Sequence, residues 1–143
     1  MLRPHTAAAL LIVALAASGC TRNRNLPTQL APSRMTTIGV NGYLWKAAVD
    51  TVSFAPLLQA DASSGVIITD WYANPRTPGE RVKLTVSILD ADLRADALRV
   101  AASRQINQNG VWIDAPVAAA TVQKLEDIIL TRARDLRRSS VRG

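Results

Sequence analysis

Residues 81–88, from Arg81 to Ile88, alternate strictly between polar and apolar side chains, and this pattern constrains the fold more than any other in the chain. Apolar residues occupy every second position from Val82 to Ile88, with charged or hydroxyl side chains between them. Successive side chains of a β-strand point to opposite faces, so the segment predicts a strand with one buried and one solvated face. One-sided burial is typical of antiparallel sheets. We therefore expect an antiparallel sheet that is covered on one face.

Further segments predict additional strands of the same sheet. They are rich in β-branched and aromatic residues or again place apolar side chains on one face. The Asn109-Gly110 pair predicts a tight hairpin, because both residues tolerate the positive φ angles of such turns. One expected strand begins at Leu57-Leu58, and the others span Val66–Tyr72, Ala97–Ile106 and Val111–Ile113.

Two segments have the spacing of an amphipathic helix. The first is expected from Gly42 to Ser53, with Asn41 as its N-cap. The second is expected to begin near Pro116, a residue suited to the first turn of a helix. Its apolar seam consists of Val122, Leu125, Ile129, Ala133 and Leu136. The elements together predict an α+β fold, with an antiparallel sheet of about five strands and two helices packed on one face.

The chain has one cysteine, Cys20, which directly follows a short apolar segment. A basic start, an apolar run over residues 7–17 and the small residues Ser18-Gly19 are the organisation of an export signal. The run is too short to span a bilayer, which needs about 20 residues. The segment Ala17-Ser18-Gly19-Cys20 resembles a bacterial lipobox, with Ala17 where leucine is usual. The alternatives are an ordinary cleaved signal with a chance cysteine and a buried apolar helix.

The lipobox resemblance implies cleavage before Cys20 and acylation of that residue, including palmitate. It thereby implies a lipoprotein held at the membrane by N-terminal acyl chains. In such lipoproteins Asp after the cysteine signals retention in the inner membrane, and Thr21 here favours the periplasmic face of the outer membrane. The expected organisation is a signal peptide (1–19), an acylated cysteine with a flexible tether (20–37), one α+β domain (38–138) and a basic tail (139–143).

The expected mature chain lacks the residues on which most catalytic and metal-binding sites depend. The only histidine, His5, lies in the expected signal, and Cys20 is consumed by acylation. We therefore expect no enzyme activity, metal or cofactor. Carboxylates leave an alternative, a cell-wall- or lipid-acting enzyme. It would use Asp70 or the Asp90–Asp96 loop. Asp70 is either a buried acid with a raised pKa or a carboxylate that is hydrogen-bonded to a loop or paired with an arginine. The Asp90–Asp96 loop is either solvated or related to a calcium loop.

Tryptophan and arginine indicate binding. Trp45, Trp71 and Trp112 either line a groove for a glycan or peptide, with Asp70 beside Trp71, or belong to the core. The formal net charge is +6, and 14 of the 17 basic residues are arginine. An exported protein has little access to nucleic acid, so we expect an envelope protein, lipid head groups or other anionic envelope phosphates as partners.

The segments Gly42–Trp45, Gly65–Tyr72 and Asp92–Asp96 resemble a family of short, uncharacterised proteobacterial lipoproteins, a domain of unknown function. That resemblance covers about residues 38–136 and implies a shared architecture without an activity. The helix with Trp45 and the strand Gly-x-Ile-x-Thr-Asp-Trp, ending at Trp71, are similar to the helix-grip domains of BamC. BamC is a lipoprotein of the machine that inserts outer-membrane β-barrels. This similarity implies a helix-grip fold and a role in outer-membrane assembly, although BamC-like proteins have two such domains and this chain has room for one.

Overall fold

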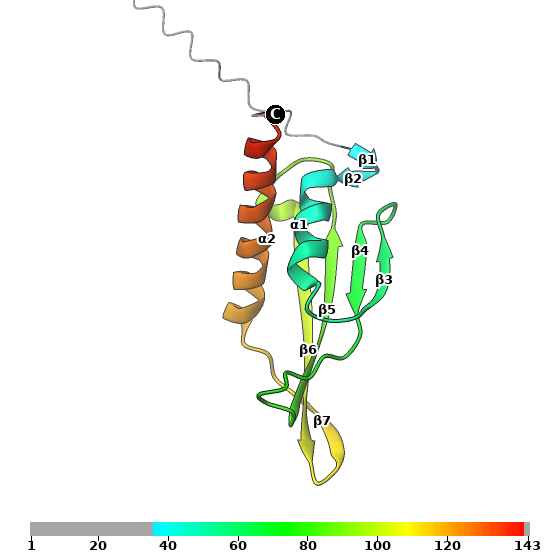
Figure 1. Ribbon diagram of the computed structural model, residues 1–143, viewed down its shortest axis with the longest axis vertical. Coiled ribbons are helices and arrows are strands. Elements are labelled where there is room, and N and C mark those ends of the chain that lie inside the picture. The colour runs from blue at the N-terminus through cyan, green and yellow to red at the C-terminus, as the bar shows by residue number, and fades with distance from the viewer. Residues whose placement is uncertain (1–35, 142–143) are drawn as a thin grey trace, which may run out of the picture.

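The computed structural model describes residues 36–141. The chain forms a five-stranded antiparallel sheet in the order β3-β4-β5-β6-β7, a separate pair β1-β2, and two α-helices (Figure 1). The strands are β1 (Thr36–Ile38), β2 (Val40–Asn41), β3 (Leu57–Asp61), β4 (Val66–Thr69), β5 (Glu80–Ile88), β6 (Leu98–Gln108) and β7 (Val111–Ala115). The helices are α1 (Gly42–Val52), α2 (Ala119–Ser139) and a short 3₁₀ helix, η2 (Ala95–Ala97).

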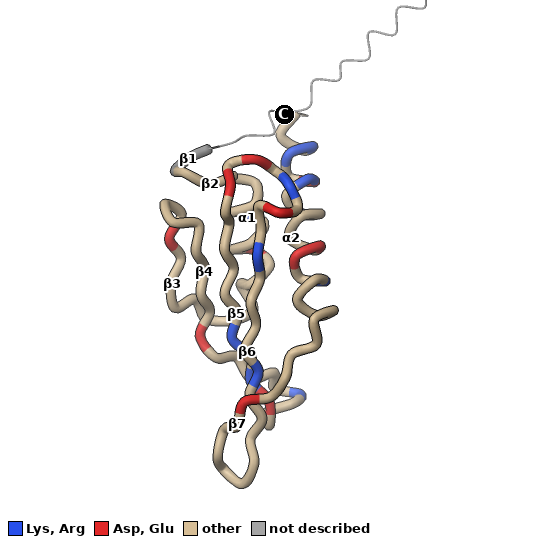
Figure 2. Tube along the Cα trace, turned by 180° about the vertical axis from the view of Figure 1, so that it is seen from behind, with Lys and Arg blue, Asp and Glu red and all other residues tan. Residues whose placement is uncertain are grey.

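Both α-helices lie side by side on one face of the sheet, with α1 over the centre and α2 along β6 (Figure 1). The view from behind shows the other face of the sheet, which no described element covers (Figure 2). The predicted α+β architecture is therefore confirmed. In residues 36–141 no helix combines the length and apolarity required to cross a membrane.

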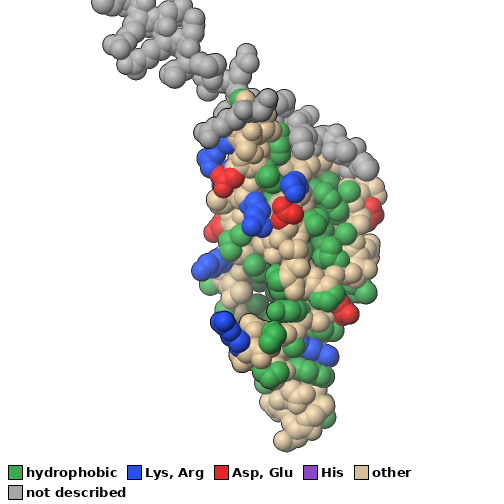
Figure 3. Space-filling view, in the orientation of Figure 1, with side chains coloured by type: hydrophobic (Ala, Val, Ile, Leu, Met, Phe, Trp, Pro, Cys, Tyr) green, Lys and Arg blue, Asp and Glu red, His purple; other side chains and the backbone are tan. Residues whose placement is uncertain are grey.

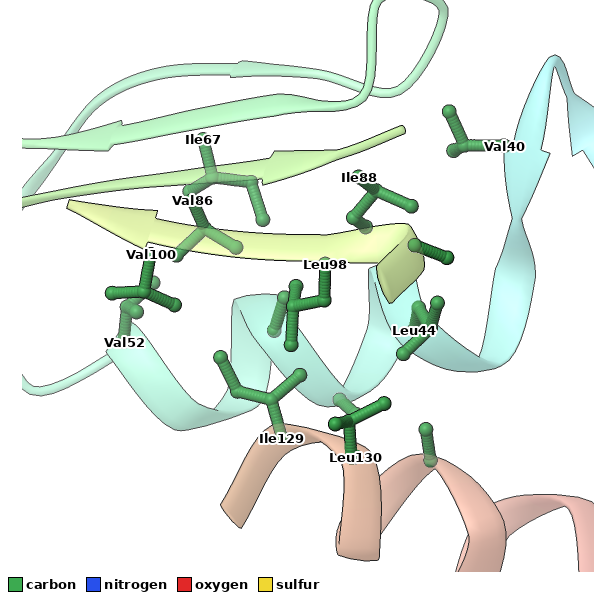
Figure 4. Packing of buried hydrophobic residues seen from close by; sticks show 14 of the residues in the cluster. Val40, Leu44, Val52, Ile67, Val86, Ile88, Leu98, Val100, Ile129 and Leu130 are labelled. Atoms are coloured by element: carbon green, nitrogen blue, oxygen red, sulfur yellow. The ribbon is translucent and has the colours of Figure 1, made fainter. Parts of the chain in front are cut away.

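The core lies between the sheet and the two helices (Figure 4). Val86 of β5 and Leu98 of β6 point at Leu44 of α1 and Ile129 of α2, and each is at most 1% exposed. Burying a side chain of this size contributes about 1.5–3 kcal/mol. The predicted seam of the second helix is confirmed, because all of its residues are buried in this cluster or pack against it.

Asn41 joins three parts of the fold. Its side-chain oxygen accepts the backbone N–H groups of Tyr43 and Leu44, each at 3.0 Å, and so caps α1 as predicted. Its amide nitrogen donates to the carbonyl of Ala91 at 2.8 Å, which fixes the loop after β5. The residue is completely buried, so these bonds replace its contacts with water.

β6 is paired on both sides only in its second half. β5 pairs with residues 98–106 of this strand, whereas β7 pairs only with residues 104–108. The free edge of the first half is covered by α2. Here the Glu126 carboxylate accepts the backbone N–H of Val100 at 2.9 Å, which holds the helix to the strand.

The turn between β6 and β7 confirms the predicted hairpin, with φ angles of 53° at Asn109 and 88° at Gly110. The prediction that Pro116 lies in the first turn of the last helix is wrong. The helix begins at Ala119. Its cap residue Ala118 is extended, with φ −65° and ψ 129°. Residues 116–118 first carry the chain from the end of β7, at Ala115, to the face of the sheet on which the helices lie (Figure 1).

Candidate functional site

An extra residue after β4 decides which way Trp71 points. Ile68 opposes Thr85, and Tyr72 opposes Val82, so four steps along one chain match three steps along the other. Such a bulge reverses the alternation of side chains beyond it. An unbroken strand would place Trp71 on the helix-covered face. The bulge places Tyr72 there and turns Trp71 to the uncovered face.

At this bulge the side chain of Thr69 takes the place of a backbone hydrogen-bond acceptor. Its hydroxyl oxygen accepts the backbone N–H of Leu84 at 2.9 Å, in place of a carbonyl from the neighbouring strand. The next residue, Asp70, donates its own N–H to the carbonyl of Pro56 at 2.7 Å. Thr69 is only 1% exposed, so the buried N–H of Leu84 depends on this side chain for a partner.

On the uncovered face, Arg81 of β5 is enclosed by two tryptophans. Its guanidinium carbon lies 4.8 Å from the ring centroid of Trp71 and 4.3 Å from that of Trp112 on β7. Both distances are within the range of a cation–π interaction, and each such contact contributes about 0.5–1 kcal/mol at a partly exposed site. We call Trp71, Arg81 and Trp112 the Trp-Arg-Trp cluster.

A hydrogen-bonded row fixes the arginine at the centre of this cluster. The Nε and Nη2 atoms of Arg81 donate to the Gln105 side-chain oxygen at 2.8 and 2.6 Å. The amide nitrogen of Gln105 donates onward to Asp114 at 2.8 Å. The three residues are cross-strand partners in β5, β6 and β7. The guanidinium plane is therefore held in place before any partner binds.

Three basic residues, Arg81, Lys83 and Arg99, lie on the uncovered face of β5 and β6, against one acidic residue of β7, Asp114. Arg99 lies at the other end of β6 from the cluster. Basic positions of the two central strands are visible in the view from behind (Figure 2). Hydroxyl and small side chains lie between them: Thr85, Ser87, Ala101 and Ser103. This surface is suited to an acidic, partly apolar protein face.

The structure separates the four predicted partner-binding residues. Trp71 and Trp112 come together around Arg81. Trp45 instead packs against the core from α1, as the core interpretation predicted. Asp70 is exposed and follows the end of β4, so it is not a buried acid. Its carboxylate accepts the backbone N–H of Trp71 at 2.7 Å, which supports the position of that tryptophan.

The Asp90–Asp96 loop is organised by an arginine. Arg94 donates to both carboxylate oxygens of Asp96, at 3.0 and 2.8 Å, and lies 3.7 Å from a carboxylate oxygen of Asp90. Hydrogen bonds from Arg94 lower the pKa of Asp96 below its ordinary value. Within the described part of the chain, no group of three or more histidine, cysteine or acidic side chains is arranged to hold a metal ion.

From the alternation alone, Arg81 is one of several residues on the solvated face of its strand and is not singled out. Its signal is the register: Arg81 opposes Gln105, and Gln105 opposes Asp114, a row that becomes visible only once the strands are aligned. The predicted lipidation site, Cys20, lies outside the described residues, as do the expected signal peptide and nearly all of the expected tether.

Comparison with known proteins places this architecture in a family. The family model of a domain of unknown function, DUF3576, matches residues 38–138. The chain belongs to the DUF3576 family. This confirms the predicted resemblance to an uncharacterised domain family.

A relative in Rickettsia prowazekii (strain Madrid E), an uncharacterised protein, is 39% identical to the chain over 103 residues. The match covers 72% of this chain and 62% of the relative, so it spans less than two thirds of that protein. Neither comparison assigns an activity to the DUF3576 domain. The expected lipid anchor and the similarity to BamC stay predictions.

Proposed function

We propose that this protein is a lipid-anchored binding protein of the cell envelope, which contacts a partner protein through the uncovered face of its sheet. The observation that carries the proposal is the Trp-Arg-Trp cluster. Tryptophan and arginine are the residues most enriched among binding hot spots. Here both types are gathered on a face that no described element covers.

The cluster is suited to binding because its geometry is fixed in advance. Ordering a rotamer-rich side chain on binding costs about 0.5–1.5 kcal/mol. Arg81 is already held by Gln105 and by two rings, so little of this cost remains. A partner carboxylate can approach the remaining guanidinium N–H groups while an apolar side chain packs on an indole ring.

The envelope location rests on the N-terminal sequence. Cleavage before Cys20 and acylation of that cysteine would hold the domain at a membrane, with residues 20–37 as the tether. We propose the periplasmic face of the outer membrane, because Thr21 rather than Asp follows the cysteine. The similarity to BamC suggests a role that assists outer-membrane assembly, with an assembly subunit or a β-barrel as partner.

Affinity purification from the native envelope tests the binding proposal. After crosslinking, the wild-type protein is expected to recover a defined envelope protein. The Arg81→Ala, Trp112→Ala double variant should recover at least about tenfold less, since hot-spot residues contribute about 2 kcal/mol or more each. Lys124→Ala, an exposed change on α2, is the control and should recover the same amount as wild type. Equal recovery by the double variant would contradict the proposal.

Two further experiments test the lipid anchor and the enzyme alternative separately. An alkynyl palmitate label should enter the wild type and not Cys20→Ser, and labelling of both would contradict the anchor. The enzyme alternative relies on the exposed Asp70 or on the loop that contains Asp92. Full complementation of a deletion strain by the Asp70→Ala, Asp92→Ala variant would remove that alternative.

A further inference from the structure

A cavity opens on the helix-covered side of the sheet, at the end where the helices stop. Its volume is about 510 Å³, which is in the size range of small-molecule sites. The space-filling view shows a hollow beside the N-terminal end of α2 (Figure 3). The wall is formed mainly by apolar side chains from β5, β6, α2 and the segment before α2: Val82, Leu84, Ala102, Pro116, Val117 and Leu125.

The cavity exists because the sheet is longer than the helices that cover it. α1 ends at Val52 and α2 begins at Ala119, whereas β5 and β6 extend further toward the hairpin (Figure 1). The apolar side chains of these strands are therefore left without a covering element. Phe54 stands at the side of the cavity, 47% exposed, with its ring 5.2 Å from that of Tyr72 in an edge-to-face contact. Apolar surface of this kind favours an apolar ligand.

The residues that line the cavity include one charged side chain, Arg104. Arg104 donates to the two carboxylate oxygens of Glu80, at 2.6 Å from Nη2 and 3.2 Å from Nε. The pair lowers the pKa of Glu80 and raises the pKa of Arg104, so both remain charged at neutral pH. These bonds use two of the five N–H donors of a guanidinium, so donors are left for a ligand.

The start of α2 adds positive potential at the same place. Its cap residue, Ala118, lines the cavity and makes no side-chain hydrogen bond to the helix, and the first turn holds no acidic residue. The positive end of the helix dipole is therefore not neutralised by the helix's own side chains. With Arg104 nearby, the cavity offers hydrogen-bond donors at one part of its wall and apolar surface elsewhere.

We propose that this cavity binds a single aliphatic chain with an anionic head group, a carboxylate or a phosphate monoester. The chain lies on Val82, Ala102 and Leu125, and the head group accepts hydrogen bonds from Arg104. The site is on the opposite face of the sheet from the Trp-Arg-Trp cluster. It does not rest on the proposed partner-binding function, and either can fail without the other.

Calorimetric titration of the full, unacylated chain with a chain-length series tests the proposal. The probes are octanoate, decanoate and dodecanoate, each below its micelle concentration, with the matching alkyl phosphates and alcohols. Each added pair of methylenes is expected to tighten binding about 15-fold, since one buried methylene contributes a factor of about four. The anionic probes should bind at least about tenfold tighter than the alcohols, because hydrogen bonds to charged groups are the stronger ones. Comparison of carboxylates with phosphates then identifies the preferred head group.

Two substitutions on adjacent positions of β6 provide the control. Ala102→Leu fills the cavity from its floor and should reduce affinity at least about tenfold. Ala101→Leu makes the same change on the opposite face and should leave affinity unchanged. Both variants are checked for an unchanged circular dichroism spectrum. The Glu80→Gln, Arg104→Gln double variant should lose the preference for anionic probes and keep the dependence on chain length.

Absence of binding by the wild type, affinity independent of chain length, or wild-type affinity in Ala102→Leu would overturn the proposal. Alcohols that bind as tightly as carboxylates and phosphates would overturn the assignment of an anionic head group.

Discussion

Replacement of Thr69 by valine tests the bulge that turns Trp71 to the uncovered face. The two side chains have nearly the same shape, but valine has no oxygen to accept the backbone N–H of Leu84. That N–H lies in the core, with Thr69 1% and Leu84 4% exposed. A buried donor left without a partner costs about 1–3 kcal/mol. The added methyl group regains up to about 0.8 kcal/mol. We therefore expect a net loss of about 0.2–2 kcal/mol in the free energy of unfolding.

Urea unfolding measures this loss, with Thr69→Ser as the matched control. Serine keeps the hydroxyl oxygen and loses one methyl group, which costs about 0.8 kcal/mol. Amide hydrogen exchange separates the two effects: Leu84 should exchange faster in the valine variant and remain protected in the serine variant. The near-ultraviolet circular dichroism of the tryptophans should change only in the valine variant, because only there does the cluster around Arg81 shift. Wild-type stability with full protection of Leu84 in Thr69→Val would show that the Thr69 hydroxyl is not needed as the partner of this N–H.

Three other substitutions test separate features of the fold. Glu126→Ala should destabilise by about 1–3 kcal/mol in urea unfolding, because the N–H of Val100 loses its acceptor, while Glu126→Gln should lose less; equal losses would contradict this role. Gly65→Ala should destabilise the protein by more than about 1 kcal/mol in thermal unfolding, because φ is 72° and a Cβ would meet the backbone of Ile88 in β5. The control Gly79→Ala should be nearly neutral, because nothing lies within 4 Å of the new Cβ. Glu80 has a lowered pKa, so its contribution to stability is present above about pH 4.3, its unfolded value, and is lost as the pH falls through the lower folded value. Unfolding measured against pH should therefore show a shallower acid loss for Glu80→Gln than for wild type, and identical slopes would show that the ion pair adds nothing.

The elements that the sequence predicted correctly are those set by local patterns. The alternation from Val82 to Ile88 and the seam around Ile129 each need only one face to be buried, and the structure buries that face. Asn41 and the Asn109-Gly110 pair act within a few residues of themselves, as a cap and a turn. Such signals can be read without knowledge of the tertiary fold.

The features that escaped prediction depend on pairing between distant segments. The sequence pattern places Trp71 in an unbroken strand, and only the pairing of Tyr72 with Val82 shows the extra residue. Arg81 becomes the centre of a cluster only because β7 brings Trp112 beside it. The late start of α2, beyond Pro116, likewise follows from the return path of the chain over the sheet. None of these arrangements has a local sequence signature.

Site-specific photocrosslinking in living cells tests whether the uncovered sheet face binds an envelope partner. A photoreactive residue is placed at Ser103, which is opposite Lys83 on that face, or at the exposed Arg134 on α2 as a control. We expect a discrete protein adduct from position 103 that is lost in the Arg81→Ala, Trp112→Ala background, and none from position 134. An adduct only from position 134, or one at position 103 that survives the double substitution, would contradict binding through this face.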